Sequence, residues 1–423
     1  MGHITSKSYY DLQKRLDKSA QGVPESESLY KILEILFTEK EAKYASKLPI
    51  KFFTVKDACK RFKLGISETK EILNSLADKG ILLDFAKGDL QAYILAPPMA
   101  GFFEFALMRT DGKFDRKILS ELFYNYITKD GFFDKGLFGL KTPSSRTYVH
   151  EDKIKSEILD YEKASNVIKT ASCITLGICY CRHKMFHIGK ACDMPQETCM
   201  TFNNVAKSLV KHGIAKEISK KQAMEILDRC RKLGLVQLGD NVQEEVNWLC
   251  NCCGCCCEPL LAYKRLKYKK RINSNFFAKV DNSNCTKCKV CIKKCPVDAI
   301  ELKNEKIWVD ADKCIGCGVC SRFCHSFSIK ILKRKKTIDV PKDSFERFII
   351  NAIEEGKIQN YVFDNYELWT NELLRHFLGV LVKLPPTKLL FAQKQLKSRF
   401  IRSLRKSKYS DIFNKLYKEG KKN

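Results

Sequence analysis

Residues 285–296 read CTKCKVCIKKCP, and residues 314–325 read CIGCGVCSRFCH. Each run spaces its four cysteines as C-x2-C-x2-C-x3-C. A tight loop can direct the first three cysteines of such a run onto one metal cluster, whereas the fourth cannot reach the same cluster. The intervening segment, 299–314, alternates like a short hairpin. The duplicated spacing is more specific than the paired C-x2-C knuckles of a zinc ribbon, and it predicts two equivalent metal sites in one small domain.

Residues 276–334 resemble a bacterial-type dicluster ferredoxin domain, which holds two [4Fe-4S] clusters. In that family the fourth cysteine of each run ligates the cluster of the other run. The resemblance therefore implies two ligand sets: Cys285, Cys288, Cys291 and Cys324 for the first cluster, and Cys314, Cys317, Cys320 and Cys295 for the second. It also implies one-electron transfer by each cluster, without bond-making chemistry. His325 departs from the family, which usually has proline there, so loop stiffness and hydrogen bonding near one cluster should differ.

The whole chain is rich in cysteine and in positive charge. Its 423 residues include 21 cysteines and 76 Lys+Arg against 49 Asp+Glu, a formal charge of +27. The 44% of hydrophobic residues excludes wholesale disorder. We see neither an apolar stretch long enough for a membrane span nor a secretory signal. We therefore expect a cytoplasmic protein, whose thiols stay reduced and whose dense cysteines indicate metal rather than disulfides.

The positive charge is concentrated in the later part of the chain. Residues 259–423 hold 37 Lys+Arg against 16 Asp+Glu, which is +21 of the +27. Five lysines crowd the cysteine loops: Lys287, Lys289, Lys293, Lys294 and Lys313. Because positive charge attracts acidic surfaces and favours a more negative reduced cluster, we expect an acidic redox partner and a potential raised relative to an acidic ferredoxin.

A second group of cysteines lies between residues 179 and 257. Residues 179–199 read CYCRHKMFHIGKACDMPQETC, and residues 250–257 read CNCCGCCC. Adjacent cysteines diverge along an extended chain, so they cannot all bind one cluster. Ten thiols are enough for one or two additional iron–sulfur clusters: Cys179, Cys181, Cys192, Cys199, Cys250, Cys252, Cys253, Cys255, Cys256 and Cys257.

Two alternatives for these thiols stay open, a zinc or other thiolate metal site and a thiol-based redox function. His183 and His187 are four residues apart, as two metal ligands on one helix face would be. Nothing else in the sequence supports a histidine-ligated metal, so we interpret them as structural. Arg182 is placed to donate hydrogen bonds to sulfur or to an anion.

The fold class is α+β, with several domains. We expect an N-terminal extension (1–27), a winged-helix-like domain (28–97), an aromatic-rich helical connector (98–172), a helical cysteine-rich middle domain (173–275), the ferredoxin-type domain (276–334) and a basic helical C-terminal region (335–423). Over residues 28–95, three helices precede a hairpin, which resembles the winged helix-turn-helix fold. Ser67 fits the start of the third helix and Gly80 its end. Ser219 and Gln222 predict a capping box.

Taken whole, the chain resembles a family of iron–sulfur proteins from anaerobic microbes. These proteins join a winged-helix-like N-terminus, a C-x-C-R…C-D-x-P-x-x-x-C segment (here CYCR and CDMPQETC), a CNCCGCC run and a dicluster module. The resemblance implies ferredoxin-type electron carriage. It brings no reaction, catalytic residue or small-molecule substrate.

Three functions follow from these patterns. The first is an electron-transfer protein, either a carrier or an oxidoreductase subunit. The second is a redox-sensing transcriptional regulator, but the exposed positions of its predicted recognition helix, 67–79, carry three acidic and two basic residues. Since DNA affinity comes largely from Lys and Arg on phosphates, we expect no nucleic acid partner. The third is a reductase with its active site at CNCCGCCC, so whether the chain is an enzyme stays open.

Basic stretches lie outside the cysteine loops as well. The segments 263–271 (YKRLKYKKR) and 397–408 (KSRFIRSLRKSK) would suit an anionic surface. The second is amphipathic, with Phe400, Ile401 and Leu404 on one side, and so allows peripheral contact with a membrane. Packing of this apolar side against the protein is the favoured interpretation.

Overall fold

The structure, a computed structural model, describes residues 5–131, 140–154, 158–266, 272, 274–335, 337–365, 368–384, 394–407 and 410–417. The chain forms two units that interleave along the sequence. Unit 1 comprises Met1–Thr142, Lys211–Ile214 and Phe345–Asn423, and unit 2 comprises Pro143–Val210 and Ala215–Ser344. The fold is α+β, as expected, with helices and four separate sheets in the described part of the chain.

The first part of unit 1 consists of helices followed by a hairpin. Its helices are α1 (Lys7–Asp17), α2 (Glu27–Leu36), α3 (Glu39–Ala45), α4 (Val55–Phe62) and α5 (Ile66–Asp78), and its antiparallel strands are β1 (Leu82–Lys87) and β2 (Leu90–Leu95). The expected start of α5 was wrong by two residues, because Gly65 is its N-cap and makes no side-chain capping bond. Gly80 follows the helix with φ of 76°, a left-handed conformation that suits glycine.

Aromatic side chains form the core beyond the hairpin. The chain continues through the π-helix η1 (Pro98–Phe102), α6 (Phe103–Met108) and α7 (Arg116–Thr128). The rings of Phe103 and Phe123 are buried and meet edge to face, with centroids 4.2 Å apart. These aromatics therefore serve packing.

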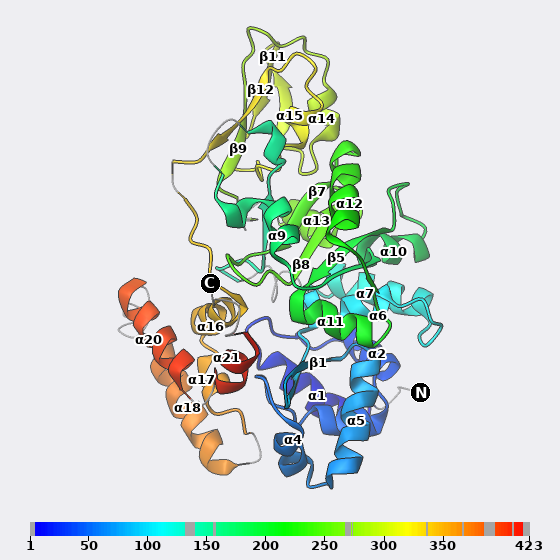
Figure 1. Ribbon diagram of the computed structural model, residues 1–423, viewed down its shortest axis with the longest axis vertical. Helices are drawn as coiled ribbons and strands as arrows, with labels where there is room; N and C mark the ends of the chain where they lie inside the picture. The colour runs from blue at the N-terminus through cyan, green and yellow to red at the C-terminus, as the bar shows by residue number, and fades with distance from the viewer. Residues whose placement is uncertain are drawn as a thin grey trace. The chain divides into compact units, whose positions relative to one another are not determined.

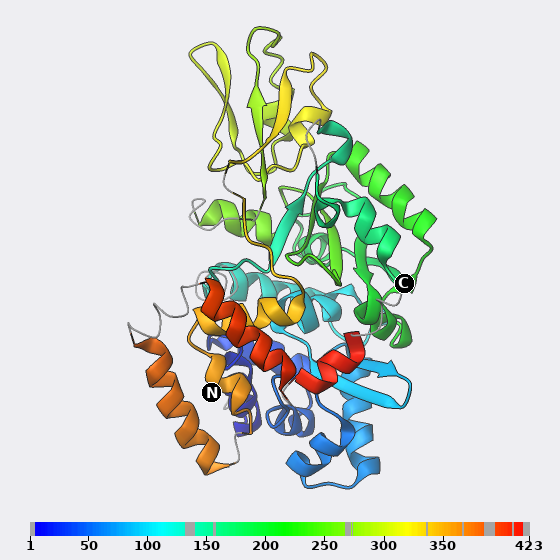
Figure 2. The same ribbon diagram turned by 60° about the vertical axis from the view of Figure 1, so that its left-hand side comes forward.

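The last helices of the chain complete unit 1. They are α16 (Ser344–Glu354), α17 (Ile358–Val362), α18 (Trp369–Lys383), α20 (Lys394–Lys406) and α21 (Asp411–Tyr417). Ile401 and Leu404 of α20 are buried in a core that also contains Ile50 and Ile349. Figure 2 shows α21, in red near the end of the chain, beside the β1–β2 hairpin, and Lys87 Nζ donates to the carbonyl of Lys415 at 2.9 Å.

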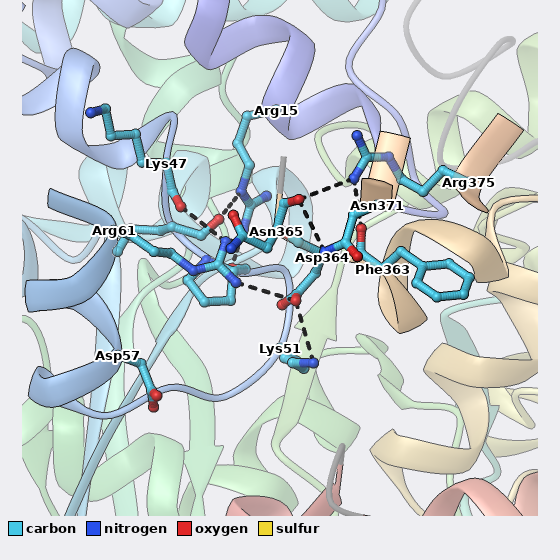
Figure 3. Close-up of polar contacts among 12 residues, drawn as sticks. Arg15, Lys47, Lys51, Asp57, Arg61, Phe363, Asp364, Asn365, Asn371 and Arg375 are labelled. Atoms are coloured by element: carbon cyan, nitrogen blue, oxygen red, sulfur yellow. Dashed lines mark hydrogen bonds and ion pairs between the residues drawn. The ribbon is translucent and has the colours of Figure 1, made fainter. Parts of the chain in front are cut away.

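A buried carboxylate ties the two ends of unit 1 together. Arg61 on α4 donates to Asp364 Oδ1 at 3.2 Å and to the Asp364 carbonyl at 2.9 Å, and Lys51 Nζ lies 3.4 Å from the same carboxylate (Figure 3). On α18, Arg375 donates to the carbonyl of Phe363 at 2.8 Å. The C-terminal helices are thus an integral part of this unit rather than a tail.

A six-stranded antiparallel sheet forms the centre of unit 2, with the strand order β3-β7-β8-β5-β4-β6. Its strands are β3 (Ser145–Tyr148), β4 (Ile174–Ile178), β5 (Glu197–Phe202), β6 (Lys216–Glu217), β7 (Val236–Asp240) and β8 (Trp248–Cys252). The expectation of a helical middle domain was therefore wrong. Segments such as ITLGI and ETCMTF, rich in β-branched residues, form strands whose pairing is long-range. Strand β3 comes from the segment expected to be a helical connector.

Helices connect the strands of this sheet and flank it. They are α9 (Ala164–Thr170), α10 (Tyr180–His187), α11 (Asn203–Lys211), α12 (Lys220–Lys232) and α13 (Glu258–Arg265), with 3-10 turns at Glu151–Lys153 and Asp160–Glu162. The predicted capping box at the start of α12 is confirmed, since Ser219 and Gln222 bond reciprocally.

The two faces of the sheet have different neighbours. Helices α9 and α12 share a core with Met200 and Leu249. Leu238 and Cys252 instead share a core with α13 and with residues of the expected ferredoxin-type domain. Because side chains alternate along a strand, Cys199, Cys250 and Cys252 lie on this second face.

The rest of unit 2 is a small domain of two-stranded sheets and short helices. Its elements are β9 (Phe276–Val280), α14 (Val290–Lys294), β10 (Ile300–Lys303), β11 (Lys306–Val309), α15 (Val319–Arg322) and β12 (Ile329–Lys333). Strand β9 pairs with β12, and β10 pairs with β11, all antiparallel. Figure 1 shows these elements together at the top of the view. Strand, cysteine loop, helix and strand follow in this order twice.

The basic stretch 263–271 lies outside the described residues from 267 onwards. No helix in the described ranges is both long and apolar enough to cross a bilayer.

Candidate metal centres

The two cysteine loops of the small domain have the same backbone conformation. Lys287 and Lys289 have φ of 55° and 60°, and the equivalent Gly316 and Gly318 have φ of 64° and 82°. A left-handed lysine is uncommon, so the loop geometry overrides the local preference of the residue. At Gly316, a Cβ atom would lie 2.3 Å from the carbonyl oxygen of Phe276, so only glycine fits. The repeated conformation indicates two copies of one cysteine-binding loop.

Each set of four cysteines that the resemblance implies surrounds its own cavity. The first cavity is lined by Cys285, Cys288, Cys291 and Cys324 together with Thr286, Ile307 and other residues. The second is lined by Cys295, Cys314, Cys317 and Cys320 together with Ala278, Val297 and other residues. We call these the outer and the inner cavity. In both, three cysteines come from one loop and the fourth from the other.

The two cavities differ in exposure. Cys288 at the outer cavity is exposed, and the backbone N–H of Val290 with the hydroxyl of Thr286 lowers its pKa. At the inner cavity Cys317 and Cys320 are buried, and burial raises the pKa of both thiols. Cys291 of the outer set is buried as well, so the outer site combines a buried with an exposed thiol, whereas the inner site has no exposed one. The two sites therefore offer a metal cluster different surroundings.

Backbone N–H groups point at sulfur in the inner cavity. The N–H of Ala278 donates to Cys314 Sγ at 3.4 Å, and that of Ala299 donates to Cys295 Sγ at 3.3 Å. Such bonds favour thiolates and help to set the potential of a bound cluster.

His150 is a neighbour of the inner cavity that the sequence did not reveal. It is fully buried, and its N–H donates to the carbonyl of Cys317 at 3.1 Å. Its Nδ1 accepts from Arg322 Nε at 3.0 Å, so its Nε2 carries the proton and donates to the carbonyl of Leu235 at 3.2 Å. Burial and the charge of Arg322 lower the pKa of His150 to about 3, so the ring is neutral. A lone histidine 167 residues before Cys317 gives no sequence signal for this contact.

The ten cysteines of the middle segment fall into two sets. One is a quartet whose Sγ atoms all lie within 4.8 Å of one another: Cys192, Cys253, Cys255 and Cys256. The other six are connected in a chain of thiol–thiol contacts, in this order: Cys179, Cys181, Cys257, Cys252, Cys250 and Cys199. We call them the quartet and the sextet.

Local backbone shape explains this division. Cys252 ends strand β8 in extended conformation, so Cys252 and Cys253 diverge into different sets, as expected for adjacent cysteines. Beyond them the chain turns, and Cys255 and Cys256 bring their Sγ atoms to 3.8 Å. The assumption of an extended chain, on which the divergence of adjacent cysteines was predicted, therefore does not hold for Cys255 and Cys256.

Buried positive charge lies among these thiols. Arg182 is completely buried, and its Nη1 donates to the carbonyl of Asn251 at 3.1 Å and lies 3.7 Å from Cys253 Sγ. A hydrogen bond from Cys256 and the charge of Arg182 lower the pKa of Cys253 to about 4. Lys184 forms a fully buried ion pair with Glu258. Buried cations need compensating negative charge, which thiolates and metal clusters supply.

The cysteine-rich run touches the small domain directly. Gly254, within CNCCGCCC, packs so closely on Pro296 that a Cβ atom there would lie 2.6 Å from the Pro296 carbonyl oxygen. Pro296 follows Cys295 of the inner cavity. Cys252 and Cys257 of the sextet also share one apolar core with Cys317. The inner cavity and the sextet are therefore neighbours.

The remaining candidates belong to neither set of thiols, although the backbone N–H of His183 donates to the carbonyl of Cys179 at 2.9 Å. His183 Nε2 and His187 Nε2 are 3.1 Å apart on α10. His325 is exposed. Cys173 Sγ lies 3.7 Å from Glu217 Oε1, Cys230 is buried in α12, and Cys59 belongs to unit 1.

Comparison with known families identifies the small domain. Residues 277–332 match the 4Fe-4S dicluster domain. A domain of this class implies two [4Fe-4S] clusters and iron–sulfur electron transfer, and the two cavities, each lined by four cysteines, fit that cofactor. No curated protein and no solved structure matched the chain. The expected dicluster domain is thus confirmed, whereas the match does not extend to the other parts of the chain.

Proposed function

We propose that this protein transfers electrons through iron–sulfur clusters, as a carrier or as a subunit of an oxidoreductase. The outer cluster would be held by Cys285, Cys288, Cys291 and Cys324, and the inner by Cys295, Cys314, Cys317 and Cys320. The observation that carries the proposal is the packing of Pro296 on Gly254. It supports a path from the inner cluster to a second group of buried thiols across one apolar core.

The outer cluster is the proposed site of electron exchange with a partner. Cys288 is exposed there, and so are Lys287, Lys289 and Lys293. Phe327 also lies near this end of the domain and is 80% exposed. A basic surface with one apolar contact suits an acidic redox protein, whose association would weaken with salt.

The sextet is the proposed site of a third iron–sulfur cluster. Four of its cysteines are buried and the other two half-buried, and six thiols exceed the four that a cubane needs. The buried Arg182, which interacts with Cys179 and Cys252 of the sextet as well as with Cys253 of the quartet, would compensate part of the negative charge of such a cluster, whereas Lys184 is already paired with Glu258. Electrons would then pass from the outer cluster to the inner one and on to the sextet.

A redox-sensing regulator is the second candidate. The sequence predicted three helices before the hairpin, whereas the structure has four between residues 27 and 78, α2 to α5. The last three of them, α3, α4 and α5, followed by β1 and β2, have the order of a winged helix, which supports this candidate. Against DNA binding, Lys79 at the end of α5 pairs with Glu41 at 2.5 Å, and Asp78 lies 2.7 Å from His212 Nδ1. These contacts leave the predicted recognition helix poorly suited to phosphate.

A reductase with its active site at CNCCGCCC is the third candidate. It ranks below electron transfer because burial of the sextet suits electron storage better than access by a substrate. Two further parts of the proposal rest on the sequence alone. They are the wider resemblance to iron–sulfur proteins of anaerobes and a cytoplasmic location. Membrane contact through 397–408 is not included, because Ile401 and Leu404 are buried in unit 1.

Anaerobic purification followed by iron and sulfide counting and an EPR-monitored redox titration tests this proposal. Two clusters give about eight irons per chain, and a third in the sextet gives about twelve. Cys179→Ser should lower twelve to about eight. A count of about eight irons in both the wild type and this variant would contradict the third cluster. Clusters that cannot be reduced reversibly would contradict electron transfer itself.

A further inference from the structure

The quartet has the sulfur spacing of a single-ion site. The Sγ atom of Cys192 lies 3.6 Å from that of Cys253 and 3.7 Å from that of Cys256, and the Cys255 and Cys256 sulfurs are 3.8 Å apart. Four thiolates around one tetrahedral zinc ion, each at about 2.3 Å, are about 3.8 Å from one another. In a [4Fe-4S] cluster each thiolate binds a different iron, so the four sulfurs lie farther apart. The observed spacing therefore matches one ion.

The chain builds this spacing from two segments. The N–H of Cys257 donates to the carbonyl of Cys253 at 3.3 Å, which closes a turn after β8. The turn brings Cys253, Cys255 and Cys256 to one side, and Cys192 arrives from the loop between α10 and β5. Contacts between segments about 60 residues apart make the site specific to the folded protein.

Charge at the quartet is also suited to a metal–thiolate centre. A divalent ion with four thiolates has a net charge of −2, which is costly to bury without a cation. The guanidinium of Arg182, 3.7 Å from Cys253 Sγ and completely buried, supplies that cation. Cys255 at the other side is exposed, so the ion has a route of entry.

We propose that Cys192, Cys253, Cys255 and Cys256 bind one zinc ion in a tetrahedral tetrathiolate site, separate from the iron–sulfur clusters. Among divalent ions, zinc binds such a site more tightly than ferrous iron. Four protein ligands leave no open position, which is the arrangement of structural zinc. The ion would fix the turn that carries Gly254 against Pro296, and would itself take no electron. This site does not depend on the electron-transfer function proposed above.

The test measures zinc and iron together in the full chain, purified anaerobically. The wild type should hold about one zinc per chain. Cys255→Ser and Cys192→Ser should lower zinc affinity at least about tenfold, because even the loss of a residue that only bonds to a metal ligand costs that much. Both variants should leave the iron count unchanged. The matched control, Cys173→Ser, removes a thiol of the same unit that contacts Glu217, and it should keep both metals.

X-ray absorption at the zinc edge of the wild type gives the number, type and distance of the zinc ligands without any variant. Four sulfur neighbours at about 2.3 Å would support the proposal. Three results would overturn it: a wild type without zinc, a single iron in the site, or a loss of about four irons in Cys255→Ser. Because zinc and iron are counted separately, failure of the electron-transfer proposal would leave this result intact.

Discussion

The dicluster loops and the quartet arrange the same side chain in opposite ways. In the dicluster domain, four cysteines surround each of two cavities. In the quartet, the four sulfurs are in contact, within 4.8 Å of one another. In the dicluster loops, residues in left-handed conformation at fixed positions hold the four sulfur atoms around a cavity. In the quartet, a closed turn after β8 brings the sulfur atoms into contact. The difference teaches that sulfur spacing, set by the backbone, selects between a polynuclear cluster and a single ion.

Loss of an inner ligand should have the largest effect. Cys317→Ala removes a thiolate from a buried set, and we expect loss of the inner cluster, about four irons per chain, with zinc retained. Iron, sulfide and zinc analysis measures it. Cys230→Ala, at another buried cysteine, is the control and should keep all metals. Full iron content in Cys317→Ala would show that Cys317 is not a cluster ligand, and would contradict the assignment of the inner cavity to an iron–sulfur cluster.

The second largest effect is expected from metal removal, which should distinguish the quartet from the iron–sulfur clusters. A strong zinc chelator should take the ion from the quartet, where Cys255 is exposed, and leave the visible absorption of the clusters intact. Because protons compete with the metal for thiolates, release should be faster at pH 6 than at pH 8. A chromogenic chelator follows the release. Bleaching of the clusters in step with zinc loss would show that the sites are not separate.

Gly254→Ala tests the packing between the cysteine-rich run and the dicluster domain. The new Cβ would lie 2.6 Å from the Pro296 carbonyl oxygen, and overpacking of this kind costs about 1–3 kcal/mol. Denaturation followed by cluster absorption should show the loss. Gly65→Ala, with nothing within 4 Å of the added atom, meets no clash, and it should cost only about 1 kcal/mol or less, because alanine is a poorer N-cap than glycine. Equal stability of the two variants would contradict the close contact.

His150→Ala should have the smallest effect. It opens space beside the inner cavity, and water entering there would stabilise the more negative reduced cluster. We expect the inner potential to rise by tens of millivolts and the outer one to stay constant. Since the pKa of His150 is lowered to about 3, the substitution removes no charge above pH 5. Equal shifts of both potentials in the EPR titration would contradict this.

Regular spacing made part of this structure predictable. The repeated cysteine runs indicated the dicluster domain, the pattern of residues 28–95 indicated a hairpin after the helices, and Ser219 with Gln222 indicated a helix start. Each of these features depends on residues close in sequence.

The features that were missed depend on distant residues or on local backbone shape. Strand β3 pairs with β7 from about 90 residues away, and His150 meets Cys317 across a longer separation. The ten middle cysteines could not be divided between sites, because Cys252 and Cys253 diverge in extended chain while Cys255 and Cys256 converge in a turn. No composition rule distinguishes these two pairs.

The interleaving of the two units has a consequence for biosynthesis. On the ribosome, residues 1–142 of unit 1 emerge before unit 2, but residues 345–423, which complete unit 1, emerge after it. Domains generally fold as units during synthesis, starting from the N-terminus. Here that order is reversed, because unit 1 cannot be completed until residues 345–423 have been synthesised, which follow the whole of unit 2. Unit 2, which contains the cysteine-rich segments, can therefore fold and bind its metals while residues 1–142 still lack the C-terminal helices that complete their unit.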